Sequence, residues 1–225
     1  MTSSSDPGSV ASSVDQNVGF HFTLSSNLSY RRPPGCLSLH VGYVLHPGVF
    51  ADPYELDQRA ESYAYTIGAM PDLERPVSAV EDHDTLLRLD LQLPSDAEGA
   101  IEVALPLHGR YGLPSSELRE EAYAVVYVPP PQAFWQCREG QGALCDAPVI
   151  SQLTCFASDI YAIPLTTAPP AKDIPLLIPV GSSDDLVLVE SGTTITVLAV
   201  FCYMALVFSK VHNRFINHLY QSKRE

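Results

Sequence analysis

The sequence predicts an all-β protein, an antiparallel β-sandwich followed by one C-terminal transmembrane helix. Three features predict it: short stretches of alternating apolar and polar residues, turn residues between them, and one uncharged apolar stretch near the C-terminus. Alternation with a period of two is typical of strands that bury one face. No amphipathic helical stretch and no internal repeat precedes residue 184, which favours a sandwich over an α/β fold.

The N-terminal segment, residues 1–18, contains seven Ser or Thr residues and little to bury, so we expect it to be disordered. A luminal β-sandwich domain is expected over residues 19–165. Its strands are expected at residues 20–24, 36–45, 61–67, 85–93, 100–107, 122–128, 149–156 and 160–163. Residues 94–99 have the composition of a turn, so the strands on either side of them are expected to form a pair. Residues 48–56 are expected to be a loop.

The C-terminal part divides into three segments. Five prolines between positions 164 and 179 exclude a helix there and predict a Pro-rich, membrane-proximal stalk over 166–190. Ser191 to Ser209 are nineteen consecutive uncharged residues, long enough for a helix of about 28 Å that spans a bilayer. A basic cytosolic tail is expected over 210–225.

Charge predicts the orientation of this helix. The tail takes four of the thirteen basic and one of the twenty-six acidic residues, which leaves nine basic and twenty-five acidic residues, a net charge of −16, before it. Positive charge prefers the cytosolic side, so the N-terminal domain is expected to be luminal or extracellular. No signal peptide is visible, so we expect an incomplete or processed N-terminus; a tail anchor with a cytosolic domain is the alternative. So acidic a domain excludes nucleic acid as a partner.

Cysteines and one sequon agree with an oxidising compartment. Cys36, Cys137, Cys145 and Cys155 precede the helix, and their even number allows two disulfides in any of three pairings. Asn27 opens the sequence's one N-glycosylation motif, Asn-Leu-Ser.

The motifs in the sequence give little support for an enzymatic activity. Asp82-His83-Asp84 has the Asp-x-Asp form with which many glycosyltransferases hold a divalent metal. An exposed acidic loop in an acidic chain explains the same residues, so we expect Asp82 and Asp84 to be dispensable. Neither zinc-binding spacing nor a nucleophile elbow nor a phosphate-binding glycine loop occurs. We therefore expect no catalytic residue, metal or cofactor.

Two stretches resemble a known family. The first is 36–59, with Phe-Ala-Asp-Pro-Tyr-Glu-Leu at 50–56; the second is 103–111, ending His-Gly-Arg-Tyr, followed by a Tyr-Val strand, three prolines and Phe-Trp-Gln-Cys at 134–137. With one C-terminal membrane helix, this order is similar to the PIG-X family. Gly109 stands where the family pattern has a larger residue.

The resemblance implies a single-pass protein of the endoplasmic reticulum membrane with a luminal domain. Members of that family are the stabilising, non-catalytic subunit of glycosylphosphatidylinositol (GPI) mannosyltransferase I. Their partner is the multi-span catalytic subunit, PIG-M, which adds the first mannose from dolichol-phosphate-mannose. The alternatives from other classes are a type I cargo receptor or adhesion ectodomain, and an enzyme using Asp82 and Asp84.

The residue types and the family resemblance together suggest several candidate contacts with a partner. Arg110 and Tyr111 end an apolar strand, where they either pin the strand to a Pro-rich loop or touch the partner. Trp135 is either part of the core or a docking anchor. On the membrane helix, one face carries Gly192, Thr196, Ala199 and Tyr203, which allows close approach of another helix.

Overall fold

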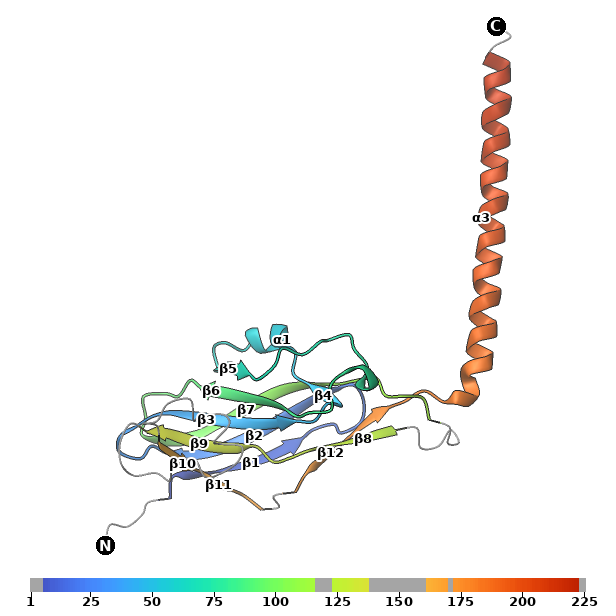
Figure 1. The fold of residues 1–225 in the computed structure, drawn as a ribbon. Coiled ribbons are helices and arrows are strands. Elements are labelled where there is room, and N and C mark those ends of the chain that lie inside the picture. Colours follow the sequence, from blue (N-terminus) through green and yellow to red (C-terminus); the bar gives the residue numbers. More distant parts are fainter. Residues whose placement is uncertain (1–5, 116–122, 138–160, 170–171, 223–225) are drawn as a thin grey trace. The chain divides into compact units, whose positions relative to one another are not determined.

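The computed structural model of the chain describes residues 6–115, 123–137, 161–169 and 172–222. The chain forms two compact units, and each is described by itself. Residues 1–113 and 122–180 make up a β unit, which holds all the strands of the described residues. Residues 114–121 and 181–225 make up the other unit, which contains the long C-terminal helix (Figure 1).

The first sheet has the strand order β11-β1-β2-β7-β4. On β2, the apolar residues Phe22, Leu24 and Leu28 are buried, whereas Asn27 and Ser29 are exposed. This is the pattern expected of a sheet with one solvated face. All its pairings are antiparallel except that of β1 with β11. The bounds are β1 (Gly8–Val14), β2 (His21–Arg31), β4 (Val49–Phe50), β7 (Glu98–Gly109) and β11 (Thr166–Thr167).

The second sheet has the order β10-β9-β3-β6-β5 and is antiparallel throughout. A disulfide between Cys36 and Cys137 joins its central strand β3 to β9, across 101 positions of sequence. Leu39, Val41 and Tyr43 of β3 are fully buried on one face. The bounds are β3 (Cys36–Leu45), β5 (Tyr63–Ile67), β6 (Thr85–Leu91), β9 (Gln132–Cys137) and β10 (Tyr161–Pro164).

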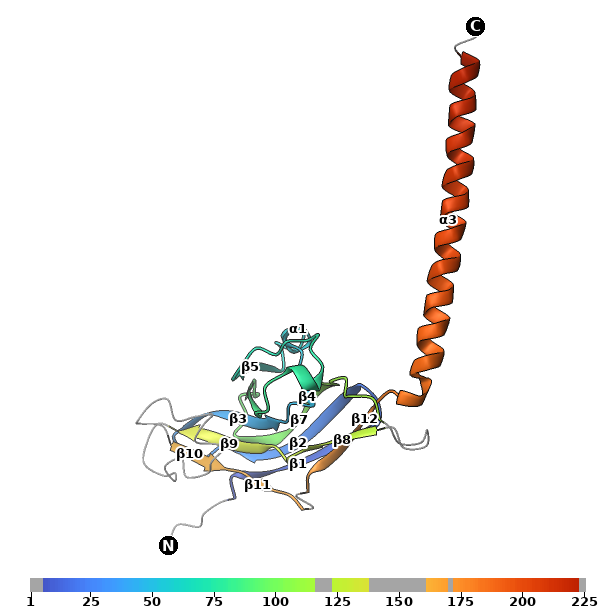
Figure 2. The ribbon, with the colours of Figure 1, turned by 45° about the vertical axis from the view of Figure 1, so that its right-hand side comes forward.

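Both sheets contribute to one buried apolar cluster, and the two layers are visible in Figure 2. Polar contacts cross the layers within it: the hydroxyls of Ser26 and Tyr43 lie 3.0 Å apart, and the hydroxyl of Tyr63 donates to the carbonyl of Ala104 at 3.4 Å. Complete burial raises the pKa of Tyr43 far above its ordinary value, although the hydrogen bond to Ser26 opposes this. The phenol therefore stays neutral, and its hydroxyl is satisfied by Ser26, as a buried polar group requires.

A two-stranded ribbon, β8 (Tyr123–Val128) with β12 (Ile174–Pro179), completes the β unit. One face of it packs into the core through Val126, Val128, Leu176 and Ile178. The backbone of Leu177 bonds to Asn17 and Gly19, which ties β12 to the link between β1 and β2. Gly109, unusual against the family pattern, has a steric reason: a Cβ there would lie 2.9 Å from the side chain of Ile178.

The helices are few. α1 (Pro53–Asp57) is one turn, capped by Asp52, whose carboxylate accepts a hydrogen bond from the Tyr54 N–H. The short 3-10 turns are η1 (Val77–Ala79) and η2 (Ser183–Asp185), and α3 runs from Leu186 to Ser222. Ser183–Asn213 is the one candidate membrane span in the described part of the chain, with a mean hydropathy of 2.0. A mostly-β chain with one apolar C-terminal helix is thus confirmed.

Several predicted boundaries were wrong. Gly8–Val14, expected to be disordered, is strand β1, because seven consecutive residues pair with β2 and Val10 is buried. The Pro-rich stalk contributes β11 and β12, since proline is compatible with short edge strands. The segment 191–209, expected to span the membrane, lies within the longer helix α3. Residues 53–57 form α1 instead of a loop. The expected strand at 149–156 lies outside the described residues.

The pairing predicted across residues 94–99 was also wrong. β6 pairs with β3 and β5 in the second sheet, whereas β7 pairs with β2 and β4 in the first. The intervening residues therefore carry the chain from one sheet to the other. Turn composition is the same for a hairpin and for such a crossing, so local sequence could not distinguish them.

Candidate functional site

The two stretches that resemble a known family lie side by side. β4 pairs with the end of β7, Val49 opposite Gly109 and Phe50 opposite His108. The next backbone N–H, that of Arg110, donates to the carbonyl of Gly48 at 2.8 Å. This pairing brings Phe50 and α1 against the last residues of β7. We call the group Phe50, Asp52, Glu55, His108 and Arg110 the β4–β7 cluster.

Arg110 is the buried centre of this cluster, with 6% of its surface exposed. Its Nη1 donates to the carbonyls of Asp72 and Arg75, at 2.5 and 3.0 Å. Its guanidinium carbon lies 4.5 Å from the centre of the Phe50 ring. Burial lowers the pKa of Arg110, and the charge of Asp72 opposes this. One cation thus holds the loop at residues 72–75 against the end of β7.

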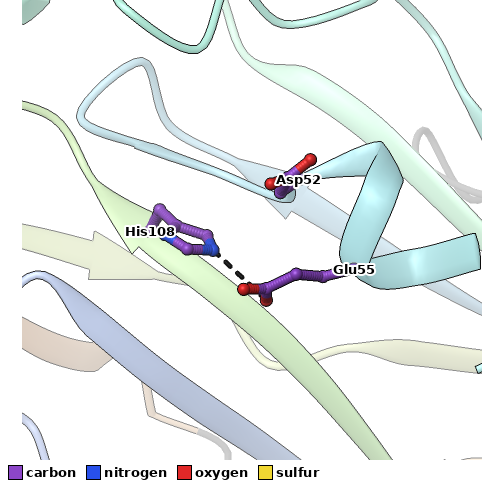
Figure 3. Close-up of side chains that lie close together, drawn as sticks. All are labelled: Asp52, Glu55 and His108. Atoms are coloured by element: carbon purple, nitrogen blue, oxygen red, sulfur yellow. Dashed lines mark ion pairs between the residues drawn. The ribbon is translucent and has the colours of Figure 1, made fainter. Parts of the chain in front are cut away.

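His108 connects the sheet to α1. Its ring stacks on Phe50 with centroids 5.3 Å apart, and its Nε2 lies 3.2 Å from Oε2 of Glu55. Figure 3 shows Glu55 extending from α1 toward the ring of His108. The ring of His21, on β2, packs nearly perpendicular to that of His108, with the ring centroids 4.6 Å apart. Three chain segments, β2, β4–α1 and β7, therefore converge on this histidine.

Asp52, Glu55 and His108 place one ligand atom each within 4.8 Å of one another, the separation a bound cation requires. Each of these groups already has a structural partner. Asp52 caps α1 through the Tyr54 N–H, at 2.9 Å, and Glu55 pairs with His108. These contacts account for the arrangement, and it carries no argument for a metal.

Two hollows flank Arg110. The larger, of about 320 Å³, lies between β4, β5 and the loop at 69–83, and both Arg75 and Arg110 border it. The smaller, of about 170 Å³, is bordered by Phe20, His108 and Tyr111. Their walls mix apolar side chains with charges of both signs, and the Arg110 donors already serve the loop. This geometry suits the attachment of a loop better than the binding of a small ligand.

A second polar network lies on β3 and β6. Nδ1 of His40 is 2.6 Å from Oδ1 of Asp90, and its Nε2 is 2.7 Å from the hydroxyl of Ser38. Arg88 also donates to Asp90, through Nε at 2.8 Å. Burial alone would raise the pKa of Asp90, but the bonds from His40 and Arg88 hold it below its ordinary value.

The order Ser38, His40, Asp90 matches that of a nucleophilic triad. Catalysis also needs donors for an oxyanion and room for a substrate beside the serine. Neither of the hollows above borders Ser38, and its hydroxyl also donates to Oε1 of Gln136 at 3.4 Å. The network satisfies a buried histidine, which is the more economical explanation.

The predicted contact residues occupy different environments. Trp135 is fully buried, and its Nε1 donates to the Pro7 carbonyl at 3.3 Å, so in this fold it offers no surface to a partner. Tyr111 is 68% exposed beside Phe20, with ring centroids 4.9 Å apart, and remains available for contact. The guanidinium of Arg110 is enclosed, as a residue that pins a loop would be.

The other predicted residues lie on the surface. Asn27 is exposed on β2, between Ala11 of β1 and Glu102 of β7. Asp82 and Asp84 are both exposed, and neither belongs to the ligand group above. Cys36 pairs with Cys137, which selects one partner for Cys36, while Cys145 and Cys155 lie outside the described residues.

On α3, the four predicted face residues are all exposed. Thr196 donates its hydroxyl to the carbonyl of Gly192 at 2.8 Å, within the same helix. A threonine bonded in this way presents its methyl group outward, so close packing would depend on the small residues more than on a hydrogen bond.

Reasoning from sequence did not find the β4–β7 cluster. Phe50, Asp52, Glu55 and His108 all belong to the stretches that carry the resemblance, but nothing local indicated that these stretches touch. An Asp-Pro pair with a glutamate three residues after the aspartate is a helix-start signal that could have revealed α1.

Comparison with known proteins gives two matches. The sequence model of the PIG-X / PBN1 family matches residues 17–209, which include most of the β unit and the apolar part of α3. The protein pbn1 of Schizosaccharomyces pombe is 27% identical over 139 residues, 58% of this chain. That alignment spans 41% of the yeast protein, so the chain corresponds to about two fifths of its relative.

Proposed function

This chain belongs to the PIG-X / PBN1 family, and on that basis we propose that it is a non-catalytic subunit of GPI mannosyltransferase I. It stabilises a multi-span, PIG-M-like catalytic subunit and so supports addition of the first mannose to the GPI precursor. The observation that carries the proposal is the family match, because it runs through both the β unit and the helix. The match confirms the resemblance found in the sequence.

The proposed location is the endoplasmic reticulum membrane, with the β-sandwich in the lumen. The Cys36–Cys137 disulfide supports this side, since the lumen is oxidising and the cytosol reducing. The acidic residues before the helix and the basic residues after it support the same orientation. A helix of the length and hydropathy of Ser183–Asn213 supports insertion.

In this proposal the partner subunit carries out the catalysis and the present chain has a structural role. The β4–β7 cluster is engaged in holding its own loop and α1, which supports a structural role for Arg110. Contact with the partner is assigned to exposed residues: Tyr111 on the β unit and the Gly192, Ala199 and Tyr203 face of α3. Both contacts would bury surface that is otherwise exposed.

Cells that lack the chain test this proposal. Its removal should lower the surface amount of GPI-anchored proteins and the steady-state amount of the catalytic subunit, and re-expression should restore both. Re-expression of an Asp82→Ala, Asp84→Ala variant should restore them equally well. Failure of that variant, with normal amounts of both subunits, would indicate catalysis by the chain. Unchanged GPI-anchored proteins in the null cells, or a chain found at the cell surface, would favour a cargo receptor or adhesion protein.

A further inference from the structure

The outward face of the β8–β12 ribbon is apolar along its whole length. Tyr123, Val125 and Tyr127 of β8 are 45%, 48% and 58% exposed, whereas Val126 and Val128, which alternate with them, are buried. Across the pair stand Pro179, Leu177 and Pro175, each directly opposite one of the three. These six residues, which we call the ribbon face, include no charged side chain.

This face is an exception within the protein. On β2 the exposed residues are His21, Asn27, Ser29 and Arg31, all of them polar. The exposed residues of this long strand are thus polar, unlike those of the ribbon. A strand with apolar residues on both faces is typical of burial on both faces, and here only one face is buried within the described structure.

Within the described residues, the ribbon also has one open edge. β12 is bonded on one side to β8 and on the other, through Leu177, to Asn17 and Gly19. β8 is the terminal strand of its sheet, and in the described part of the chain its ladder bonds go to β12 alone. Its sequence, Tyr-Ala-Val-Val-Tyr-Val, lacks the proline or lysine with which proteins usually protect an edge.

Only a short connection separates the ribbon from α3 in the sequence. Six residues, 180–185, join the end of β12 to the first residue of α3. At no more than about 3.5 Å each, they reach about 20 Å. A partner held in the same membrane, as the catalytic subunit of the proposed function would be, is therefore within reach of the ribbon face.

Charge and edge chemistry select among the possible occupants. The residues before the helix carry a net charge of −16, which disfavours both an anionic lipid surface and a second copy of the chain. Lipid also cannot bond in register to the row of backbone N–H and C=O groups along β8. An extended protein segment with apolar side chains satisfies both the edge and the face.

We propose that β8 and the ribbon face bind an extended apolar segment of the catalytic subunit, from a luminal loop next to the membrane. The segment adds to the edge of β8 as a further strand, and its side chains contact Tyr123, Val125 and Tyr127. This assignment rests on the proposed function for the identity of the occupant. The surface itself rests on the exposure and pairing of the ribbon.

Photo-crosslinking of the full-length chain in microsomes tests the contact. p-Benzoylphenylalanine replaces Tyr123 or Tyr127, and a control replaces Tyr54, which is 72% exposed on α1. Positions 123 and 127 should give an adduct with the catalytic subunit, and position 54 should give none. Adducts with a second copy, with lipid only, with a different protein, or equally from position 54 would each overturn the assignment, as would no adduct.

Substitution separates this inference from the proposed function. A Val125→Asp, Tyr127→Asp variant should recover at least about tenfold less catalytic subunit in mild detergent, since desolvated aromatic contacts dominate such interfaces. A Tyr54→Asp control should recover the wild-type amount. Equal recovery by the double variant would overturn the ribbon contact and leave the proposed function intact, whereas no recovery by the wild type would reject the proposed function itself. Retention of the Cys36–Cys137 disulfide and of the melting temperature shows that the variant folds; if it does not, Tyr127→Asp alone takes its place.

Discussion

The guanidinium carbon of Arg110 lies 4.5 Å from the centre of the Phe50 ring, although the two residues are 60 positions apart in the sequence. The same guanidinium donates to the carbonyls of Asp72 and Arg75. The contact joins β4, the end of β7 and the loop at 72–75. It is the physical link between the two stretches by which the family resemblance was found.

Replacing Arg110 by Met should destabilise the β unit by about 2–3 kcal/mol. The change leaves two carbonyls without their charged donor and removes the cation above Phe50. Chemical denaturation of the full-length protein in detergent measures the loss. Arg31→Met is the matched control, because Arg31 and its partner Glu98 are both largely exposed, and it should cost less than about 1 kcal/mol. Equal effects of the two variants would contradict a structural role for Arg110.

Removing the disulfide should lower the free energy of unfolding by more than replacing Arg110 does. A Cys36→Ala, Cys137→Ala variant frees a loop of about one hundred residues in the unfolded chain, which corresponds to roughly 3–5 kcal/mol. Unfolding under oxidising conditions, compared with the wild type with and without reductant, gives the value. Cys202→Ser, an exposed position on α3, should leave the stability of the β unit unchanged. A wild type that is insensitive to reductant would argue against the bond.

The Asp90 network predicts how stability depends on pH. The pKa of Asp90 is lowered in the folded protein, so its stabilisation is present above the ordinary value of 3.8 and is lost as pH falls through the lower, folded value. Asp90→Asn should cost about 1–2 kcal/mol at pH 7 and lose less stability than the wild type between pH 5 and pH 3. Asp96→Asn, on an exposed loop, is the control. Parallel pH curves for the wild type and Asp90→Asn would contradict the coupling.

The helix face should matter for the amount of the partner. Gly192→Leu with Ala199→Leu fills the small-residue stripe of α3 and should lower the steady-state amount of the catalytic subunit, while the chain itself still inserts. The control is Val197→Leu with Phe201→Leu, on the opposite side of the helix at about 100° per residue. Unchanged partner levels, or full rescue by an unrelated membrane helix, would assign all of the stabilisation to the β unit.

Asn27 should carry a glycan in cells. Its side chain is exposed on β2, and the sequon lies on the side of the helix expected in the lumen. Glycosidase treatment should increase the gel mobility of the wild type and leave Asn27→Gln unaffected. Protease treatment of sealed microsomes checks the topology independently, since the β unit should be protected. Protection of the C-terminal tail instead would reverse the orientation.

Much of the local structure could be predicted from the sequence. The alternating stretch 36–45 has the same bounds as β3, and the uncharged stretch 191–209 lies within α3. These features depend on neighbouring residues, because side chains alternate across a strand and an apolar helix needs only its own backbone bonds. Even so, β1 and β12 were missed, since Ser-rich and Pro-rich segments become strands only when another strand supplies their hydrogen bonds.

Only the tertiary structure decided which elements meet. The sequence left three disulfide pairings open, and the fold brings Cys36 beside Cys137 because β3 pairs with β9. It separates β6 and β7, which are neighbours in sequence, and it joins Phe50 to Arg110. Alternation fixes which side of a strand is buried, but the choice of neighbouring strand depends on how all the apolar faces fill one core. The resemblance named the family from its motifs, and the packing explains why these motifs occur together.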